Sequence, residues 1–336
     1  MKQHNNNRDL TSLTTSGNKW KGIVYAILYG WVAKGFFSLE PGVKNAVPAS
    51  GVTTISFMFL VPFVMGLIIA YRQQTAVKSS RKSILFFMPL IAVISLFTIY
   101  LLWQQDGIIY ALIAFPAYAV MAIAGSIAGH FIFALKKNVF ILSVCLLLPF
   151  LLSPLENHFG MNDAIYWKQS TVSIHSSEDS VWKNIIRVKA ISEEENKGNL
   201  FQLIGFPKPI KAEFDTIAVG GVRKAIFDRG LLFTETIKTI VPNKVLAFNI
   251  KADPGSRPVT DLEKHVIVDG KYFEVLEGKY EIEKTGHNKI NLHLYARYRV
   301  STHFNFYSGF WARMIMEEIQ KNILEVVKHR SELERS

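Results

Sequence analysis

The sequence predicts two fold classes in one chain: an N-terminal all-α transmembrane bundle of four or five spans, then a C-terminal α+β domain with a curved antiparallel sheet and a long C-terminal helix. Its 336 residues are 49% hydrophobic and only 19% charged, whereas about a quarter of the residues in an ordinary soluble domain are charged. Residues 1–155 hold 12 Lys or Arg and 3 Asp or Glu, against 26 and 24 in the remainder. We therefore divide the chain into a multi-pass transmembrane region at 1–155 and a globular domain at 165–332.

Long apolar runs fill the first region. A helix needs about 20 mostly apolar residues to cross a bilayer. Three runs reach that length without an internal Lys, Arg, Asp or Glu: residues 52–71, 84–103 and 108–135. Residues 139–155 form a shorter run, and residues 22–39 are the weakest candidate because they contain Lys34. We expect five spans, with four as the alternative, and we expect the small residues Gly125 and Gly129 to lie where two spans approach closely.

Basic residues alternate between the loops. The N-terminal tail, residues 72–82 and the turn at 136–137 are basic, whereas the loops at 40–51 and 104–107 hold one lysine between them. Because positively charged loops stay in the cytoplasm, we expect an integral protein of a bacterial inner (plasma) membrane with a cytoplasmic N-terminus and an extracytoplasmic C-terminal domain. The basic residues that give the chain its net charge of +11 then reflect its orientation in the membrane. We expect no nucleic-acid partner, since the globular domain shows no basic face with interleaved stacking aromatics.

The second half alternates apolar and polar residues and closes on one long amphipathic helix. Ser176 and Ser177 precede two acidic residues, which is typical of a helix start. Turn signals then separate a series of strand-like stretches. The predicted strands are residues 171–175, 211–219, 222–227, 231–240, 245–252, 266–268 with 272–276, 279–284 and 289–300. The closing helix covers roughly 306–330, and its predicted apolar stripe comprises Phe310, Trp311, Ile315, Ile319, Ile323, Val326 and Val327.

Signals for catalysis or metal binding are weak in this chain. The single cysteine, Cys145, excludes a disulfide scaffold. Serine-hydrolase, zinc-protease and phosphate-loop motifs are missing, and the histidines of the second half lack the spacing of metal ligands. We therefore expect no metal, no cofactor and no catalytic residue, and we interpret the acidic segment at 193–195 as a solvated loop.

Several short motifs follow one another in the second half. They are Val181–Trp182, Gly221–Arg223, Phe227 with Gly230, Phe233–Ile237, Leu246–Phe248, Gly278–Ile282, Tyr298 and Tyr307–Trp311. In this order, over about residues 168–332, they resemble the START-like superfamily (SRPBCC; polyketide cyclase/dehydrase and lipid-transport proteins). The first half is similar to the N-terminal region of multi-pass bacterial membrane proteins that end in such a domain, through Asp106–Gly107, Pro116 and the Gly125/Gly129 region.

The resemblance implies a helix-grip fold, in which a sheet wraps around the C-terminal helix and leaves a cavity for an apolar ligand. Such pockets are mostly apolar and carry a few orienting polar groups. The candidate cavity residues are Arg223, Phe227, Glu235, Phe248, Tyr298 and Trp311. Each has a structural alternative: core packing for the aromatic ones, a cross-strand ion pair for Arg223 with Glu235, and a hydroxyl directed at solvent for Tyr298.

The resulting hypothesis is an integral membrane protein whose START-like domain binds a lipid or another hydrophobic small molecule at the membrane surface. One alternative is a cyclase/dehydratase-type enzyme that acts on a hydrophobic substrate through Arg223, Glu235 or Tyr298. Another is a membrane assembly or scaffold module that holds partner membrane proteins.

Overall fold

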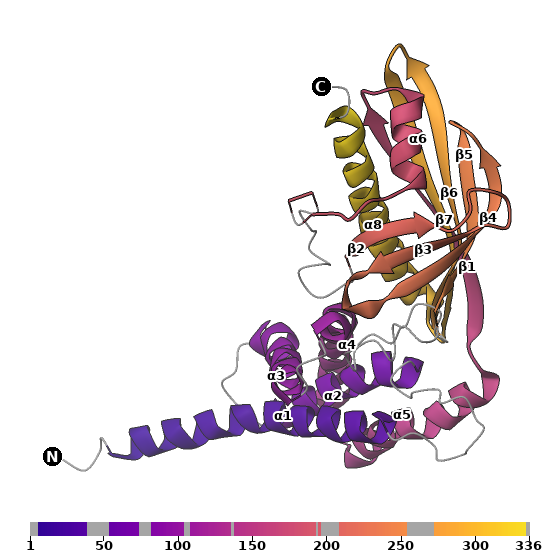
Figure 1. Cartoon of the computed structure of the whole chain (residues 1–336). Helices are drawn as coiled ribbons and strands as arrows, with labels where there is room; N and C mark the ends of the chain where they lie inside the picture. Colours follow the sequence, from indigo (N-terminus) through magenta and orange to yellow (C-terminus); the bar gives the residue numbers. More distant parts are fainter. Residues whose placement is uncertain are drawn as a thin grey trace. The chain divides into compact units, whose positions relative to one another are not determined.

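The chain folds into two compact units, Met1–Met161 and Asn162–Ser336. The computed structural model describes residues 6–38, 54–73, 82–103, 108–135, 138–192, 194–195, 208–253 and 272–333. Within these residues the first unit is entirely helical and the second contains all the strands (Figure 1). The motif Asp106–Gly107 and the predicted strand at 266–268 lie outside the described residues.

Five α-helices make up the described part of the first unit. They are α1 (Asn6–Ser38), α2 (Val61–Gln73), α3 (Met88–Trp103), α4 (Ile108–Leu135) and α5 (Val139–Phe159), with π-helical turns at Ser56–Leu60 and Ser83–Phe87. Among the described residues, 4 helical segments are long and apolar enough to cross a membrane: Ser56–Gln73, Ser83–Trp103, Ala111–Ala134 and Val139–Glu156. Because α1 is not among them, the structure supports the alternative of four spans.

Glycines set the contact between α2 and α4. A Cβ atom at Gly66 of α2 would overlap the carbonyl of Ala122, and one at Gly125 of α4 would overlap the carbonyl of Phe63. Gly129 lies next along the same face of α4, against Ala70 and Leu67 of α2. The two backbones therefore approach as closely as glycines permit, which confirms the close contact predicted for Gly125 and Gly129.

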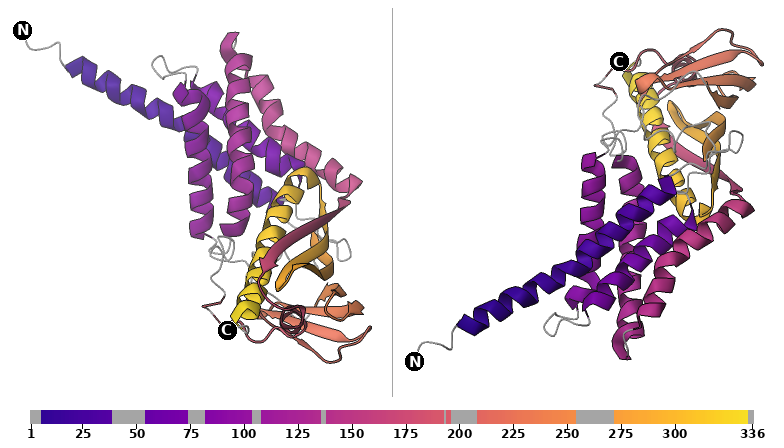
Figure 2. Two further views of the ribbon diagram at one scale, coloured as in Figure 1. Left: turned by 90° about the horizontal axis from the view of Figure 1, so that it is seen from above. Right: turned by 90° about the horizontal axis from the view of Figure 1, so that it is seen from below.

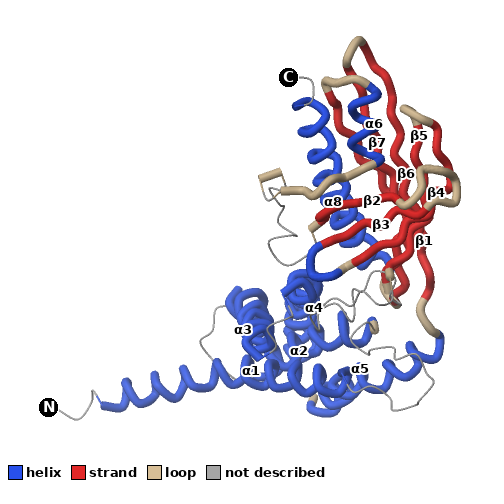
Figure 3. The backbone as a smooth tube through the Cα atoms, viewed as in Figure 1, coloured by secondary structure: helices blue, strands red, loops and turns tan. Residues whose placement is uncertain are grey.

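Seven strands form one sheet in the second unit, with the order β1–β7–β6–β5–β4–β3–β2 (Figures 1 and 3). The strands are β1 (Asn162–Ile174), β2 (Pro209–Phe214), β3 (Val222–Phe227), β4 (Leu232–Val241), β5 (Val245–Ala252), β6 (Phe273–Gly286) and β7 (Lys289–Thr302). All six neighbouring pairs are antiparallel. Along β7 every second residue from Ile290 to Val300 is buried, so one face of the sheet is the core face.

The strands differ from the predicted ones in three places. β1 begins at Asn162 instead of residue 171, because its alternation of burial starts well upstream. β6 is one strand where two were predicted, since a register shift between Val275 and Glu277 absorbs the irregularity without ending the pairing. β2 ends at Phe214, and the following residues turn back toward β3 through a bond from the Gly221 amide to the Ala218 carbonyl.

Two helices cover the core face of the sheet. α8 (Asn305–Leu333) lies along β1 and β7, and α6 (Glu178–Ile186) packs beside it (Figure 2). The predicted helix start is confirmed, since the Ser177 hydroxyl accepts a hydrogen bond from the Ser180 amide at 3.2 Å. In α8, Ile315 and Val327 are buried as predicted, but Phe310 is 54% exposed. Its place on the buried stripe was wrong, because a step of about 100° from Trp311 turns it to the outer face.

The last turns of α8 hold the segment that follows α6. The Arg330 guanidinium donates to both carboxylate oxygens of Glu195, at 2.7 and 2.8 Å, and to the carbonyls of Lys189 and Ala190. These hydrogen bonds lower the pKa of Glu195 to about 2. The prediction of a solvated acidic loop was therefore wrong for Glu195, which ties this segment to α8.

We predict that Gly125→Ala destabilises the helical unit, because its methyl group meets the fixed backbone of Phe63 and the two helices must separate. Overpacking of this kind costs about 1–3 kcal/mol. The thermal denaturation midpoint of the full chain in detergent should fall clearly. The matched control is Gly35→Ala in α1, where a Cβ meets nothing within 4 Å. Equal midpoints for the two variants would contradict the close packing of α2 and α4.

We predict that Glu195→Gln lowers the stability of the second unit at pH 7 and that the difference from the wild type disappears in acid. The pKa of Glu195 is depressed to about 2 in the folded chain, so its stabilisation is present above its unfolded pKa of about 4.3 and is lost as the pH falls toward 2. Thermal midpoints measured from pH 7 to pH 2.5 test this. Glu194→Gln changes an exposed neighbour and should show no such dependence.

Candidate functional site

A charged pair is buried under α6. Arg223 on β3 and Glu235 on β4 are register partners, and they are only 3% and 7% exposed. The Arg223 Nε donates to the Glu235 carboxylate, and its Nη1 donates to the Ile185 carbonyl at 3.0 Å. Ile185 lies in the last turn of α6, so the guanidinium satisfies a carbonyl that the helix itself leaves without a partner. The cross-strand ion pair that was the structural alternative is thus present.

Aromatic rings surround the guanidinium of Arg223. Its Cζ lies 4.6 Å from the ring centroid of Phe248, 5.4 Å from that of Phe214 and 5.8 Å from that of Tyr280. Burial lowers the pKa of Arg223, but the Glu235 carboxylate and the Tyr280 hydroxyl together outweigh that effect, and the pKa stays above its ordinary value. The arginine therefore keeps its charge inside an aromatic box. We call Arg223, Glu235, Phe248 and Tyr280 the arginine cluster.

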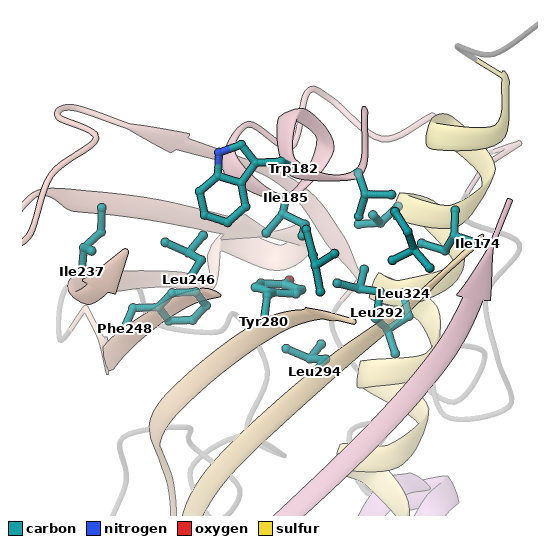
Figure 4. Close-up of a cluster of buried hydrophobic side chains, with 14 residues drawn as sticks. Ile174, Trp182, Ile185, Ile237, Leu246, Phe248, Tyr280, Leu292, Leu294 and Leu324 are labelled. Atoms are coloured by element: carbon teal, nitrogen blue, oxygen red, sulfur yellow. The ribbon is translucent and has the colours of Figure 1, made fainter. Parts of the chain in front are cut away.

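The arginine cluster lies beside the largest apolar core of the unit. Figure 4 shows Trp182 and Ile185 of α6 facing Leu246, Phe248 and Tyr280 of the sheet. Tyr280 is 4% exposed, and burial raises the pKa of its hydroxyl. The polar groups here contact one another and the protein backbone, so the arrangement chiefly joins α6 to the sheet.

A second group of aromatic residues lies between β7 and α8. Tyr298 is 0% exposed and stacks on Tyr166 at 5.7 Å between ring centroids, with Phe273 at the same separation. Ala312 and Met316 of α8 complete the apolar surroundings. Figure 2 shows α8 lying along the strands that carry these residues. We call Tyr166, Phe273 and Tyr298 the tyrosine cluster.

The hydroxyl of Tyr298 points into the protein, contrary to the solvent-directed alternative. It is buried, and no described residue meets it in hydrogen-bond geometry. Burial raises the pKa of Tyr298, and the guanidinium of Arg313 nearby opposes that rise only in part. A buried hydroxyl without a partner costs about 1–3 kcal/mol. The Tyr298 hydroxyl is therefore one of the buried polar groups of the unit that an additional partner would stabilise, together with those of Ser173, Arg297 and Trp311.

The remaining two candidates lie apart from these clusters. Phe227 packs edge-on against Phe233 at 5.2 Å, in a small core with Ala212, Ala225 and Ala252. Trp311 on α8 contacts the rings of Tyr307 and Phe310, and its indole nitrogen is buried without an acceptor among the described residues. The structure thus brings together Arg223, Glu235 and Phe248, and it separates Phe227, Tyr298 and Trp311 from that group.

Three aromatic residues of the clusters escaped the sequence prediction. Tyr280 lies in a motif that carries the resemblance, and the inward parity of β6 could have identified it. Tyr166 was missed because the first strand was predicted to begin downstream of it. Phe273 lies inside the strand predicted at 272–276 but was not among the candidate cavity residues.

We predict that Glu235→Gln destabilises the second unit strongly, because it leaves the Arg223 charge buried without its counterion. Breaking a buried pair costs about 3–5 kcal/mol, whereas the double variant Arg223→Met/Glu235→Leu should cost much less. Glu213→Gln, which breaks the exposed pair with Lys211 at 3.3 Å, should cost about 0–1 kcal/mol. Denaturant unfolding of all three variants measures this. A double variant as unstable as Glu235→Gln would contradict the argument.

Comparisons with known proteins were made for the whole chain. No protein-family model and no curated protein sequence matches it. Solved structures match about half of it at low identity. The Zhui aromatase/cyclase from Streptomyces sp. R1128 is 15% identical over 52% of this chain and 97% of its own, with a TM-score of 0.31. Norcoclaurine synthase from Thalictrum flavum is 12% identical over 49% and 95%, with a TM-score of 0.28. The Mll3558 protein from Rhizobium loti is 14% identical over 50% and 99%, with a TM-score of 0.30.

The strand order and the helix along the core face decide the fold of the C-terminal unit. One antiparallel sheet runs from β1 at one edge to β2 at the other, and α8 lies against β1 and β7. This is the arrangement that the resemblance to the START-like superfamily implies. The C-terminal unit therefore has a helix-grip-like fold, and it follows a helical region with four candidate membrane spans among the described residues.

Proposed function

We propose that the helix-grip domain binds a lipid or another hydrophobic small molecule between its sheet and α8. The observation that supports this most directly is the Tyr298 hydroxyl, which is buried beside apolar and aromatic side chains and the Arg313 guanidinium and meets no described group in ordinary hydrogen-bond geometry. A ligand with one polar atom and an apolar body would satisfy that hydroxyl and contact the surrounding rings. Sites for such ligands combine an apolar lining with a few polar groups in this way.

A membrane lipid is the ligand class that the rest of the chain favours. The candidate span Val139–Glu156 lies in α5, and only Gly160 and Met161 separate the end of that helix from β1. The domain is therefore tethered close to a bilayer. Lipid molecules are the apolar compounds at the highest local concentration in such a place.

The enzymatic alternative has less support from the geometry. A general acid or base has to reach its substrate with a free lone pair or proton. The carboxylate of Glu235 is occupied by Arg223, and the guanidinium is occupied by that carboxylate and by the Ile185 carbonyl. The arginine cluster is thus better explained as a structural element than as the catalytic part of a cyclase or dehydratase.

The charges of the loops support an extracytoplasmic domain. Residues 74–82 and 136–137 hold Lys78, Arg81, Lys82, Lys136 and Lys137 and follow the first and third candidate spans. If both loops are cytoplasmic, the chain leaves the fourth span on the opposite side. A cytoplasmic N-terminus requires in addition that α1, which is not among the four candidate spans of the described residues, crosses the membrane.

We predict that Tyr298→Phe weakens ligand binding and leaves folding intact. The probe is a phosphatidylcholine with a photoreactive diazirine in one acyl chain, incorporated into nanodiscs with the full chain. Crosslinks should occur on peptides of β7 and α8 and should be reduced by unlabelled lipid. Loss of one hydrogen bond of about 1 kcal/mol should raise the half-saturating probe fraction roughly fivefold.

Tyr295→Phe is the matched control, because Tyr295 alternates to the other face of β7, where Lys279 lies 4.1 Å from its ring. It should bind the probe like the wild type. Crosslinks confined to the candidate spans, or equal half-saturation for the wild type and Tyr298→Phe, would contradict the proposed site.

A further inference from the structure

The outer face of α8 changes character along its length. Phe306, Phe310 and Met314 follow one another at intervals of four residues and therefore share one face of the helix. They are 74%, 54% and 39% exposed. Further along the helix, Lys321, Glu325 and His329 are also exposed but polar. We call the first three residues the apolar stripe. A helix in contact only with water and a sheet would keep polar residues along its whole outer face.

The apolar stripe lies at the end of the domain that is joined to the membrane region. β1 begins at Asn162, and the Asn305 side chain at the start of α8 donates to the Asn162 carbonyl at 2.6 Å. α5 ends at Phe159, so Asn162 is at most about 11 Å from the last residue of that helix. Phe306 directly follows Asn305, and Phe310 lies about 6 Å further along the helix.

We propose that the apolar stripe is a bilayer-docking surface, with Phe306 and Phe310 buried among the lipid headgroups and upper acyl chains. A helix that lies at a membrane interface buries its apolar face by about 5–10 Å, and the covalent connection to α5 holds the stripe within that reach. The exposed polar residues further along the helix, from Lys321 to His329, then extend away from the bilayer. This inference is independent of ligand binding by the domain.

The docked orientation decides which connections of the domain face the bilayer. The strands of the sheet have one set of ends on the side where α8 starts. At these ends β1, β4 and β6 begin, and β3, β5 and β7 finish. In this orientation the connections between β3 and β4 and between β7 and α8 face the membrane. A lipid could pass between the bilayer and the tyrosine cluster at that end of the domain.

The test places a fluorophore at single cysteines in the full chain. Cys145 is the one native cysteine, so Cys145→Ser provides the background for Phe306→Cys, Phe310→Cys and His329→Cys, each labelled with NBD in nanodiscs. Lipids with a nitroxide near the top of the acyl chain should quench about half of the fluorescence at positions 306 and 310, as for a helix at the interface. Position 329 is the exposed control near the other end of the same helix and should be barely quenched.

Each other outcome would overturn the proposal. Weak quenching at all three positions would show that the stripe stays in water. Equal quenching at 329 would show that the whole helix lies flat on the membrane. A blue-shifted emission at 310 without quenching, lost when each nanodisc holds one chain, would instead identify an interface between copies. If one labelled variant does not fold, Met314→Cys replaces it, and the double variant Phe306→Ser/Phe310→Ser should abolish quenching at 314. Failure of lipid crosslinking at Tyr298 would leave these readings unchanged.

Discussion

The pairing of β1 with β7 is the interaction on which the C-terminal unit depends. It runs without a register shift from Asn162 opposite Thr302 to Ile174 opposite Ile290. β1, the first strand of the unit along the chain, is thereby joined to β7, its last strand along the chain. α8 packs on both. Such a pairing closes a loop of more than a hundred residues, so its entropic cost is recovered only when the sheet and α8 form together.

The arginine cluster and the tyrosine cluster differ in whether their buried polar groups have hydrogen-bond partners. In the arginine cluster each charged group meets a partner: the carboxylate, the guanidinium and a helix-end carbonyl satisfy one another inside an aromatic box. A closed set of this kind stabilises one arrangement of α6 on the sheet. In the tyrosine cluster the Tyr298 hydroxyl remains without a bond. This difference in hydrogen bonding separates the structural cluster from the proposed binding site.

The membrane region and α8 use apolar surface in different ways. Between α2 and α4 there is little side-chain surface, because glycines let the two backbones touch. Close van der Waals packing then stabilises the helix pair. On α5 large side chains such as Leu147 and Leu151 are exposed, as expected for a helix that lipid surrounds. The apolar stripe of α8 shares that exposure but covers only the first turns of an otherwise polar face. These differences in where apolar groups are left uncovered underlie the proposed docking of α8 on a bilayer.

Local composition and periodicity were enough to predict four of the five expected spans, most strands and the C-terminal helix, because each depends on neighbouring residues. They also predicted the pairing of Arg223 with Glu235, which lie on consecutive strands. The sequence alone could not predict that Glu195 binds Arg330, a residue 135 positions away, or that Phe310 faces outward while Ile315 is buried. Nor could it predict that the Tyr298 hydroxyl is buried near the Arg313 guanidinium without a hydrogen bond of ordinary geometry. These properties depend on which distant side chains meet in space, and only the tertiary structure decides that.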